Sequence, residues 1–277
     1  MSRVENLEVF YDTQKMCAES VTLRNNIKAS REYTEVITEN CTKSPNLNRF
    51  DEDANVIVSK KRSLEAASGY KNGKTTVLNF ASATNPGGGV TRGSSAQEES
   101  ICRISTLYNC LNDDECFDKF YIPHREARDP IHNDDIIYTP DVTVFKSDTA
   151  IPKVMAKDKW YNVDIITCAA PNLRDNPSNP NIPDEKGKAV SISDEKLLKI
   201  HEKRLKKILD VAVEKETDNI ILGAFGCGAF KNNPEVVAQA ASNVLKDYIH
   251  SFKNIEFAIY DKGECENFKA FNNILNK

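Results

Sequence analysis

The sequence predicts an α/β domain built on a largely parallel sheet that is covered on both faces. The C-terminal half alternates short β-branched runs with longer helical patterns, which is typical of strand–helix–strand units. Lys74–Ala81 is a β-branched run and Val163–Ala169 a similar short stretch, and both are typical of strands buried in a sheet. The chain has 277 residues, 40% of them hydrophobic, which is enough for a sizeable core.

The N-terminal third favours helices that lead into the sheet. Asn6–Met16 carries apolar residues at roughly helical spacing. Tyr33–Thr38 and Asn55–Ser59 alternate like short strands. Ser63–Gly69 predicts a short helix ended by glycine, and Lys74–Ala81 then forms the first buried strand.

The middle of the chain is less regular. Asp113–Asp135 holds prolines and many acidic residues, and we expect a long connection there. Ile136–Phe145 predicts two short strands broken at Pro140. Pro171–Ser193 is rich in Asn, Pro, Ser and Asp and predicts a long functional or mobile loop.

The C-terminal part gives the clearest pattern. Asn233 and Pro234 are suited to cap and begin a helix that runs towards Phe252. The other elements expected here are two helices and two strands: helices Asp194–Glu216 and Asn267–Leu275, and strands Asn219–Gly223 and Ile255–Tyr260.

Composition excludes several classes of protein. No apolar run approaches the ~18 residues of a membrane span. The net charge of −4 argues against a protein that binds duplex nucleic acid. The eight cysteines contain no C-x-x-C pair, so we expect no metal site of the usual kind. The beginning of the sequence shows no secretory signal, so we expect a cytoplasmic protein with reduced thiols.

The first informative stretch is Asn79–Glu99, called here the first glycine segment. It contains NFASATNPGGGVTRGSSAQEE, in which a strand enters three consecutive glycines and a helix then begins near Ser95. Glycines allow a positive φ and a close approach of backbone N–H groups to a ligand. Ser95 and Glu98 fit a capping box, which leaves a structural alternative for Glu98 but none for Glu99.

The second stretch is Ile220–Pro234, called here the second glycine segment. It contains IILGAFGCGAFKNNP, in which a strand runs into three glycines before a helix. Unpaired N–H groups before a helix favour an anion such as phosphate, and the alternative is a tight turn without a ligand. Phe225 and Phe230 flank these glycines, either as core anchors or as surfaces for a sugar or base. The spacing fits neither a Walker motif nor the dinucleotide fingerprint.

Two glycine segments at the carboxyl ends of strands in one sheet face the same crevice. A phosphate cradle, paired carboxylates and nearby aromatic rings indicate a phosphorylated sugar or a nucleotide as ligand. Reasoning from the residues alone ends with a nucleotide-like ligand and acid chemistry without a metal.

The first glycine segment resembles the signature of poly(ADP-ribose) glycohydrolases. In GGGVTRGSSAQEE, seven residues separate the glycines from Gln-Glu-Glu, and the later GAFGCGAF resembles microbial-type members of that family. The resemblance implies a macrodomain-like three-layer α/β/α sandwich with a mixed sheet, plus an N-terminal helical segment. It thus predicts residues 1–50 as an accessory segment and 51–277 as the catalytic domain.

The resemblance also implies an activity: cleavage of ribose–ribose O-glycosidic bonds of poly(ADP-ribose), mainly from chain ends, without cofactor or metal. Glu99 becomes the general acid and base, and Glu98 and Gln97 would hold ribose hydroxyls and orient it. The other residues it places around the substrate are Asn85, Gly87, Gly88, Gly89, Gly223, Ala224, Phe225, Gly226, Cys227, Gly228, Ala229, Phe230 and, for adenine, Tyr260. The expected partners are poly(ADP-ribose), ADP-ribose and ADP-ribosylated proteins, bound by a monomer.

Two other readings stay open. One is a hydrolase of another ADP-ribosyl linkage, on protein, on nucleic acid or in O-acetyl-ADP-ribose. The other is a module that binds ADP-ribose without cleaving it. The paired carboxylates Glu98 and Glu99 favour an enzyme over the binding module.

Overall fold

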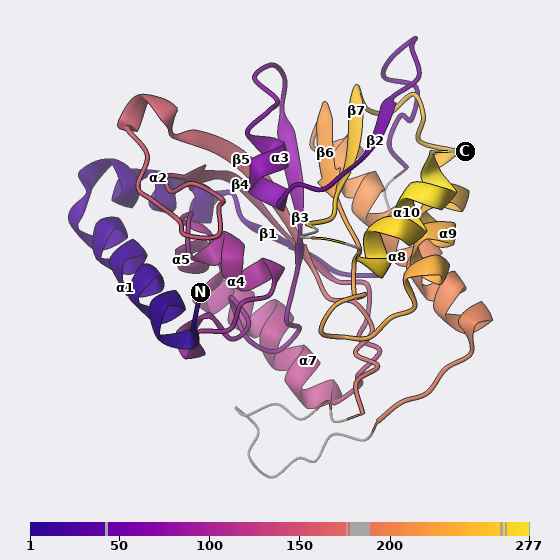
Figure 1. Ribbon diagram of the computed structural model, residues 1–277, viewed down its shortest axis with the longest axis horizontal. Coiled ribbons are helices and arrows are strands. Elements are labelled where there is room, and N and C mark those ends of the chain that lie inside the picture. The colour runs from indigo at the N-terminus through magenta and orange to yellow at the C-terminus, as the bar shows by residue number, and fades with distance from the viewer. Residues whose placement is uncertain (42–43, 176, 178–188, 261–262, 264, 277) are drawn as a thin grey trace.

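The computed structural model describes residues 1–41, 44–175, 177, 189–260, 263 and 265–276. A central seven-stranded sheet carries helices on both faces, which makes three layers (Figure 1). The sandwich and its mixed sheet confirm the predicted fold class.

The sheet has the order β1-β4-β5-β3-β6-β7-β2. The five strands from β5 to β2 are parallel, whereas β4 is antiparallel to both of its neighbours. The strand bounds are β1 Glu35–Ile37, β2 Asn55–Ser59, β3 Thr75–Phe80, β4 Ile136–Val144, β5 Tyr161–Cys168, β6 Asn219–Leu222 and β7 Asn254–Ala258. The carboxyl ends of the parallel strands therefore share one edge of the sheet.

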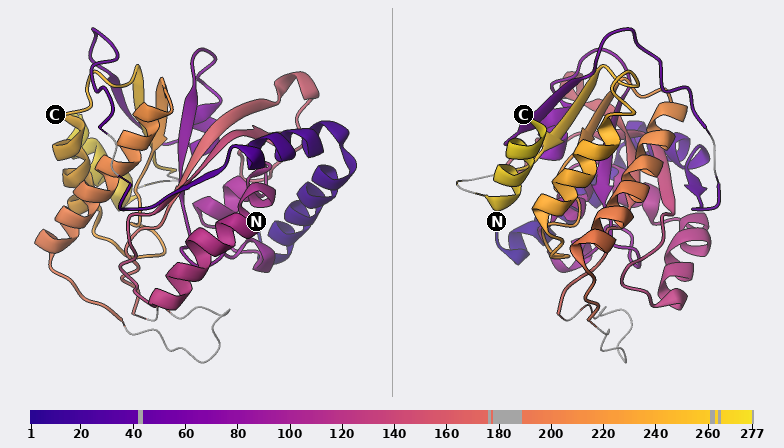
Figure 2. Two further views of the ribbon diagram at one scale, coloured as in Figure 1. Left: turned by 180° about the vertical axis from the view of Figure 1, so that it is seen from behind. Right: turned by 90° about the vertical axis from the view of Figure 1, so that its right-hand side faces the viewer.

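The helices fall into an N-terminal and a C-terminal set. The α-helices of the first half are α1 Arg3–Glu19, α2 Val21–Glu32, α3 Ser63–Ala67, α4 Gln97–Cys102, α5 Leu107–Leu111, α6 Asp114–Cys116 and α7 Ile122–Ala127. Short 3-10 turns lie at η1 Val90–Arg92 and η3 Lys157–Lys159, and η2 Phe117–Tyr121 is a π-helix. The later helices, α8 Asp194–Glu214, α9 Pro234–Leu245 and α10 Glu266–Leu275, lie side by side on one face (Figure 2).

Alternating side chains of each strand supply the two halves of the core. In β3, Val77 packs with α3, α4 and α5, and Leu78 packs with α8 and α9 on the opposite face. Ile165 and Ile166 of β5 divide in the same way. This period of two explains why both strands carry buried side chains on both faces and show no alternation of apolar and polar residues.

Two predictions for the middle of the chain are wrong. Asp113–Asp135 contains helix from Asp114 to Ala127, because its apolar side chains, including the fully buried Phe120 and Tyr121, pack into the core. Ile136–Phe145 forms one strand, β4, because an irregularity between Thr139 and Val142 accommodates Pro140 without ending the strand.

The remaining predicted elements are present with shifted ends. The side chain of Asn233 caps α9 and Pro234 occupies its first turn, but this helix ends at Leu245 rather than near Phe252. Within the predicted loop Pro171–Ser193, residues 176 and 178–188 lie outside the described residues. None of the helices in the described part of the chain combines the length and apolar character that a bilayer crossing requires.

The N-terminal helices pack along one flank of the domain (Figure 1). Thr13 of α1 donates a hydrogen bond to the carbonyl oxygen of Arg103, just after α4. The buried Lys146 donates to Asp12 and to the carbonyl oxygen of Val9. Helix α1 therefore contacts the segments that surround α4.

Candidate active site

A cleft of about 820 Å³ lies at the carboxyl edge of the sheet. Residues that follow β2, β3, β5, β6 and β7 all line it. Its volume lies within the range of small-molecule sites. Both glycine segments border this cleft, as predicted from their positions after strands.

Glu98 and Glu99 lie in the first turn of α4 and are both buried. The carboxylate of Glu98 accepts hydrogen bonds from the backbone N–H of Ser82 at 2.7 Å and from the side chain of Asn79 at 3.4 Å. Oε1 of Glu99 accepts a 2.8 Å hydrogen bond from the N–H of Gly89. Its Oε2 is buried and has no partner within the described residues.

Gly88 is the point at which both carboxylates meet the backbone. A Cβ on this residue would lie 2.8 Å from Oε1 of Glu99 and 2.9 Å from Oε2 of Glu98. Its φ of +59° is also a conformation that side chains disfavour. Only glycine therefore fits between the two carboxylates and the cleft.

The two carboxylates are electrostatically coupled. Burial, and next the charge of Glu99, raise the pKa of Glu98 well above its usual range. Hydrogen bonds from Ser82, from Asn79 and from the backbone of Gly87 lower this pKa, but by less. Because burial and the adjacent carboxylate both disfavour the negative charge, the carboxyl group of Glu98 keeps its proton to a higher pH than a carboxyl group in water does.

Gln97 connects α4 to the sheet. Its Oε1 accepts from the N–H of Phe80 at 2.9 Å, and its Nε2 donates to Oγ of Ser63 and to the carbonyl oxygen of Leu78. These bonds fix the first turn of α4 against β3. A contact of Gln97 with ribose stays a prediction, since its amide already serves the fold.

The capping-box alternative for Glu98 is wrong. The N-cap of α4 is Ala96, and no side chain caps this helix. The carboxylate of Glu98 instead points towards the backbone after β3, where it bonds Ser82. Glu98 therefore takes no part in capping α4.

The second glycine segment presents unused backbone donors to the cleft. Gly226, Gly228, Ala229 and Phe230 line it, and their N–H groups donate no hydrogen bond within the described part of the chain. Adjacent free N–H groups form an anion-binding concavity.

Asn232 shapes this segment from behind. Its buried side chain donates to the carbonyl oxygens of Pro171, Gly226 and Phe230, and its Oδ1 lies 2.8 Å from Nε2 of His201 on α8. The loop conformation is thus set by α8 and by the segment after β5.

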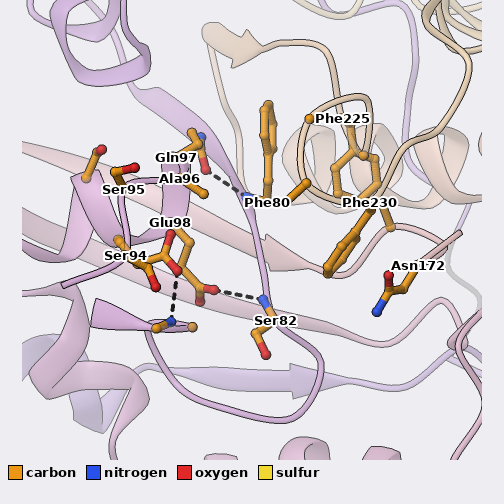
Figure 3. Close-up of a pocket in the computed structure, with 18 of the residues that line it drawn as sticks. Phe80, Ser82, Ser94, Ser95, Ala96, Gln97, Glu98, Asn172, Phe225 and Phe230 are labelled. Atoms are coloured by element: carbon orange, nitrogen blue, oxygen red, sulfur yellow. Dashed lines mark hydrogen bonds between the residues drawn. The ribbon is translucent and has the colours of Figure 1, made fainter. Parts of the chain in front are cut away.

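Aromatic rings face the carboxylates from the other side of the cleft. Phe80 and Phe225 pack with ring centroids 5.6 Å apart, and Phe230 lies nearby (Figure 3). Tyr260 also lines the cleft, and the guanidinium of Arg62 lies 3.9 Å from its ring centroid. Flat apolar surfaces of this kind suit a base and a sugar.

The structure brings most of the predicted site residues together. Those that line the cleft are Asn85, Gly88, Gly89, Gln97, Glu98, Glu99, Ala224, Phe225, Gly226, Gly228, Ala229, Phe230 and Tyr260. Gly87, Gly223 and Cys227 do not line it. A Cβ on Gly87 would lie 2.8 Å from the Tyr108 ring, and one on Gly223 would lie 2.9 Å from the Phe80 ring, so both glycines serve packing.

Sequence reasoning missed several residues of the cleft wall. Those that come from other parts of the chain are Arg3, Arg62, Asp148, His124, Arg125, His132, Asn172 and Arg174. Ser82 and Ser94 lie inside the first glycine segment. Their closeness in sequence to the two glutamates could have marked them as cleft residues. In the described part of the chain, no three His, Cys, Asp or Glu side chains are placed to hold a metal ion.

The fold and the cleft define an α/β protein with a buried carboxylate pair opposite a glycine loop whose backbone N–H groups face the cleft. The family described as microbial-type PARG, catalytic domain, where PARG is poly(ADP-ribose) glycohydrolase, matches residues 6–147. The chain belongs to this family. A comparison of the sequence with curated proteins gave no match.

Solved structures of such enzymes resemble the whole chain. Poly(ADP-ribose) glycohydrolase from Thermomonospora curvata, bound to the inhibitor ADP-HPD, is 25% identical, with a TM-score of 0.79 over 97% of this chain and 98% of that one. The enzyme from Deinococcus radiodurans, in complex with ADP-ribose, is 27% identical, with a TM-score of 0.74 over 90% and 96%.

Proposed function

We propose that this protein is a poly(ADP-ribose) glycohydrolase. It would hydrolyse ribose–ribose O-glycosidic bonds and release ADP-ribose without a cofactor. Family membership and the likeness to enzymes solved with ADP-ribose or an inhibitor support this. The observation that carries it is the buried pair Glu98 and Glu99 in the same cleft as four free backbone N–H groups.

The cleft suggests how the terminal ADP-ribosyl unit binds. The N–H groups from Gly226 to Phe230 would donate to the diphosphate. The ribose at the scissile bond would lie between Phe230 and Gly88, close to the carboxylates. Adenine would reach towards Tyr260, at the end where Cys265 and Asn267 complete the wall.

Glu99 is the proposed general acid and base. Its carboxyl group gives a proton to the oxygen that joins the two riboses, and the C–O bond breaks to leave an oxocarbenium-like sugar. Water then attacks the anomeric carbon and returns a proton to Glu99. The hydrogen bond from Gly89 holds one oxygen of Glu99 and so orients its carboxyl group for this proton transfer.

Glu98 and Gln97 have supporting roles in this proposal. Glu98 is held by Ser82 and Asn79, and burial beside the charge of Glu99 raises its pKa, so it adds less negative charge next to the proposed acid. Gln97 holds the turn that carries both acids. We also propose that the protein is a cytoplasmic, monomeric macrodomain acting on ADP-ribosylated proteins, with residues 1–50 as its accessory segment.

The test is incubation with radiolabelled poly(ADP-ribose), followed by chromatography of the products. We expect free ADP-ribose as the product, without added metal and in the presence of a chelator. Parallel reactions with a mono-ADP-ribosylated protein and with O-acetyl-ADP-ribose distinguish the other ADP-ribosyl hydrolases. An intact polymer, with tight binding of ADP-ribose by calorimetry, would instead indicate a binding module.

A further inference from the structure

The cleft continues beyond the carboxylates to the junction between α1 and η1. Arg3, Arg92 and Ser94 line this part of it. The N–H of Ser94 donates a 3.1 Å hydrogen bond to the carbonyl oxygen of Gly89, whose own N–H donates to Glu99. A single residue, Gly89, therefore links Ser94 at this junction to Glu99, the proposed catalytic acid.

Helix α1 and η1 are packed without space between them. The buried side chain of Asn6 donates a 2.9 Å hydrogen bond to the carbonyl oxygen of Gly93. A Cβ on Gly93 would lie 2.3 Å from the carbonyl oxygen of Arg3, and the φ of Gly93 is +74°. Arg3 and Arg92 consequently sit on adjacent, mutually fixed pieces of backbone.

The lining of the cleft is rich in arginine, although the chain has a net charge of −4. Its arginines are Arg3, Arg62, Arg92, Arg125, Arg128 and Arg174. Arg62 packs on Tyr260, Arg125 donates to Thr84 and Asn85, and Arg174 donates to Asn172. The exposed side chains of Arg3 and Arg92 have no hydrogen bond or ion pair to any described residue.

We propose that Arg3 and Arg92 form a subsite for the diphosphate of the leaving part of the polymer. The inference rests on the proposed function. The diphosphate of the unit being released is assigned to the free N–H groups of the second glycine segment, which lies across the cleft from Ser94 and Ser95 (Figure 3). The group that receives the proton from Glu99 departs on the side of Glu99, which is the side of Arg3 and Arg92.

The chemistry of the polymer fits two arginines at this position. Every ADP-ribosyl unit carries a diphosphate, so the first unit beyond the cleaved bond brings two anionic phosphates near Glu99. Guanidinium groups bind phosphate oxygens with paired, charge-assisted hydrogen bonds. The subsite would hold the polymer for cleavage without taking part in the cleavage of the bond.

The experiment compares two substrates that differ only in the leaving group. One is poly(ADP-ribose), and the other is ADP-ribose joined through its anomeric carbon to a small neutral phenol. Arg3→Gln, Arg92→Gln and the double variant are compared with Lys28→Gln, which removes an exposed charge from α2 outside the cleft. KM and kcat are measured at low and at high salt, with thermal denaturation as the control of folding.

We expect each single variant to raise KM for the polymer about 2- to 5-fold, as exposed ion pairs do, with little change in kcat. The double variant should add the two effects and show a weaker dependence of KM on salt. The phenol substrate should give the same kinetics within about twofold for all variants, and Lys28→Gln should match the wild type on both substrates.

An equal loss on both substrates, or no loss on either, would overturn the subsite. A wild-type protein that cleaves the phenol substrate but not the polymer would overturn the proposed function, and the subsite with it. The two failures can be distinguished. Failure of the subsite appears in the arginine variants while the wild type still cleaves the polymer, whereas failure of the proposed function appears in the wild type itself.

Discussion

The N–H of Gly89 donates a 2.8 Å hydrogen bond to Oε1 of Glu99, whereas Oε2 of the same carboxyl group has no partner among the described residues. One oxygen is thus oriented by the first glycine segment, whereas the other is buried without a hydrogen-bond partner among the described residues. The hydrogen bond from Gly89 therefore fixes the orientation of the carboxyl group that we propose as general acid and base.

Replacing Glu99 by glutamine tests its proposed role as general acid and base. The amide oxygen of Gln can still accept from Gly89, but an amide neither supplies nor accepts the required proton. We expect the Glu99→Gln variant to lose about 10²–10⁴-fold in kcat while ADP-ribose binding by calorimetry stays within a few fold. The control is Glu8→Gln, on the exposed face of α1, which should keep full activity. A Glu99→Gln variant with most of the wild-type rate would refute the assignment.

Gly226 and Gly228 offer a matched pair within one loop. A Cβ on Gly226 would lie 2.7 Å from Cβ of Ala170, and its φ is +80°, whereas a Cβ on Gly228 meets nothing within 4 Å. We expect Gly226→Ala to lower the free energy of unfolding by about 1–3 kcal/mol, and Gly228→Ala to change it by less than about 0.5 kcal/mol. Urea denaturation measures both, and equal losses for the two variants would contradict this account.

The proposed position of adenine near Tyr260 predicts the order of product release. Tyr260, packed against Arg62, and Asn267 of α10 line that end. A terminal unit fits such a site more readily than a unit inside a long chain. In a time course on sized polymer, we therefore expect free ADP-ribose from the first time points and gradual shortening of long chains. Early oligomers of middle length with almost no monomer would show internal cleavage instead.

His201 predicts a loss of stability in mild acid. Burial first, and then Arg204, lower the pKa of His201 from 6.5 to about 4, against a hydrogen bond with Asn232 that raises it. The folded state therefore holds a neutral imidazole, and its contribution is present above about pH 6.5 and is lost as the pH falls towards 4.

His201→Gln removes this titration and keeps an N–H donor for Asn232. From pH 7 to about pH 4.5, the wild type should lose about 2 kcal/mol more unfolding free energy than His201→Gln loses. Replacing the half-exposed His250 by glutamine is the control and should leave the wild-type loss in place. Parallel curves for the wild type and His201→Gln would contradict the prediction.

The parts of the fold with a local signal were predictable from the sequence. Strands β3 and β5 are apolar runs of the right length, and both glycine segments are visible as short motifs after strands. The helix from Asp114 to Ala127 was missed because its acidic residues and Pro123 are poor helix signals. Buried Phe120 and Tyr121 supply the packing that stabilises it, and Pro123 lies in the first turn of α7, where proline is tolerated.

The candidate site was predictable to a similar extent. Glu98, Glu99 and the loop glycines belong to contiguous motifs, so their residue types and spacing were sufficient. Asn232 was missed because its importance depends on contacts with Pro171 and His201, which are distant along the chain. Arg3 was missed because α1 meets η1 only in the folded protein.

The three hydrogen bonds of Gln97 bear on inhibition. They attach the turn that carries Glu98 and Glu99 to β3 and to Ser63, so the fold itself holds both acids in place. A rigid pocket of this kind gives the liberated ADP-ribose nearly every contact that it gave the same unit at the end of the polymer. We therefore expect departure of the product to be slow, and accumulating ADP-ribose to compete with fresh chains for the cleft.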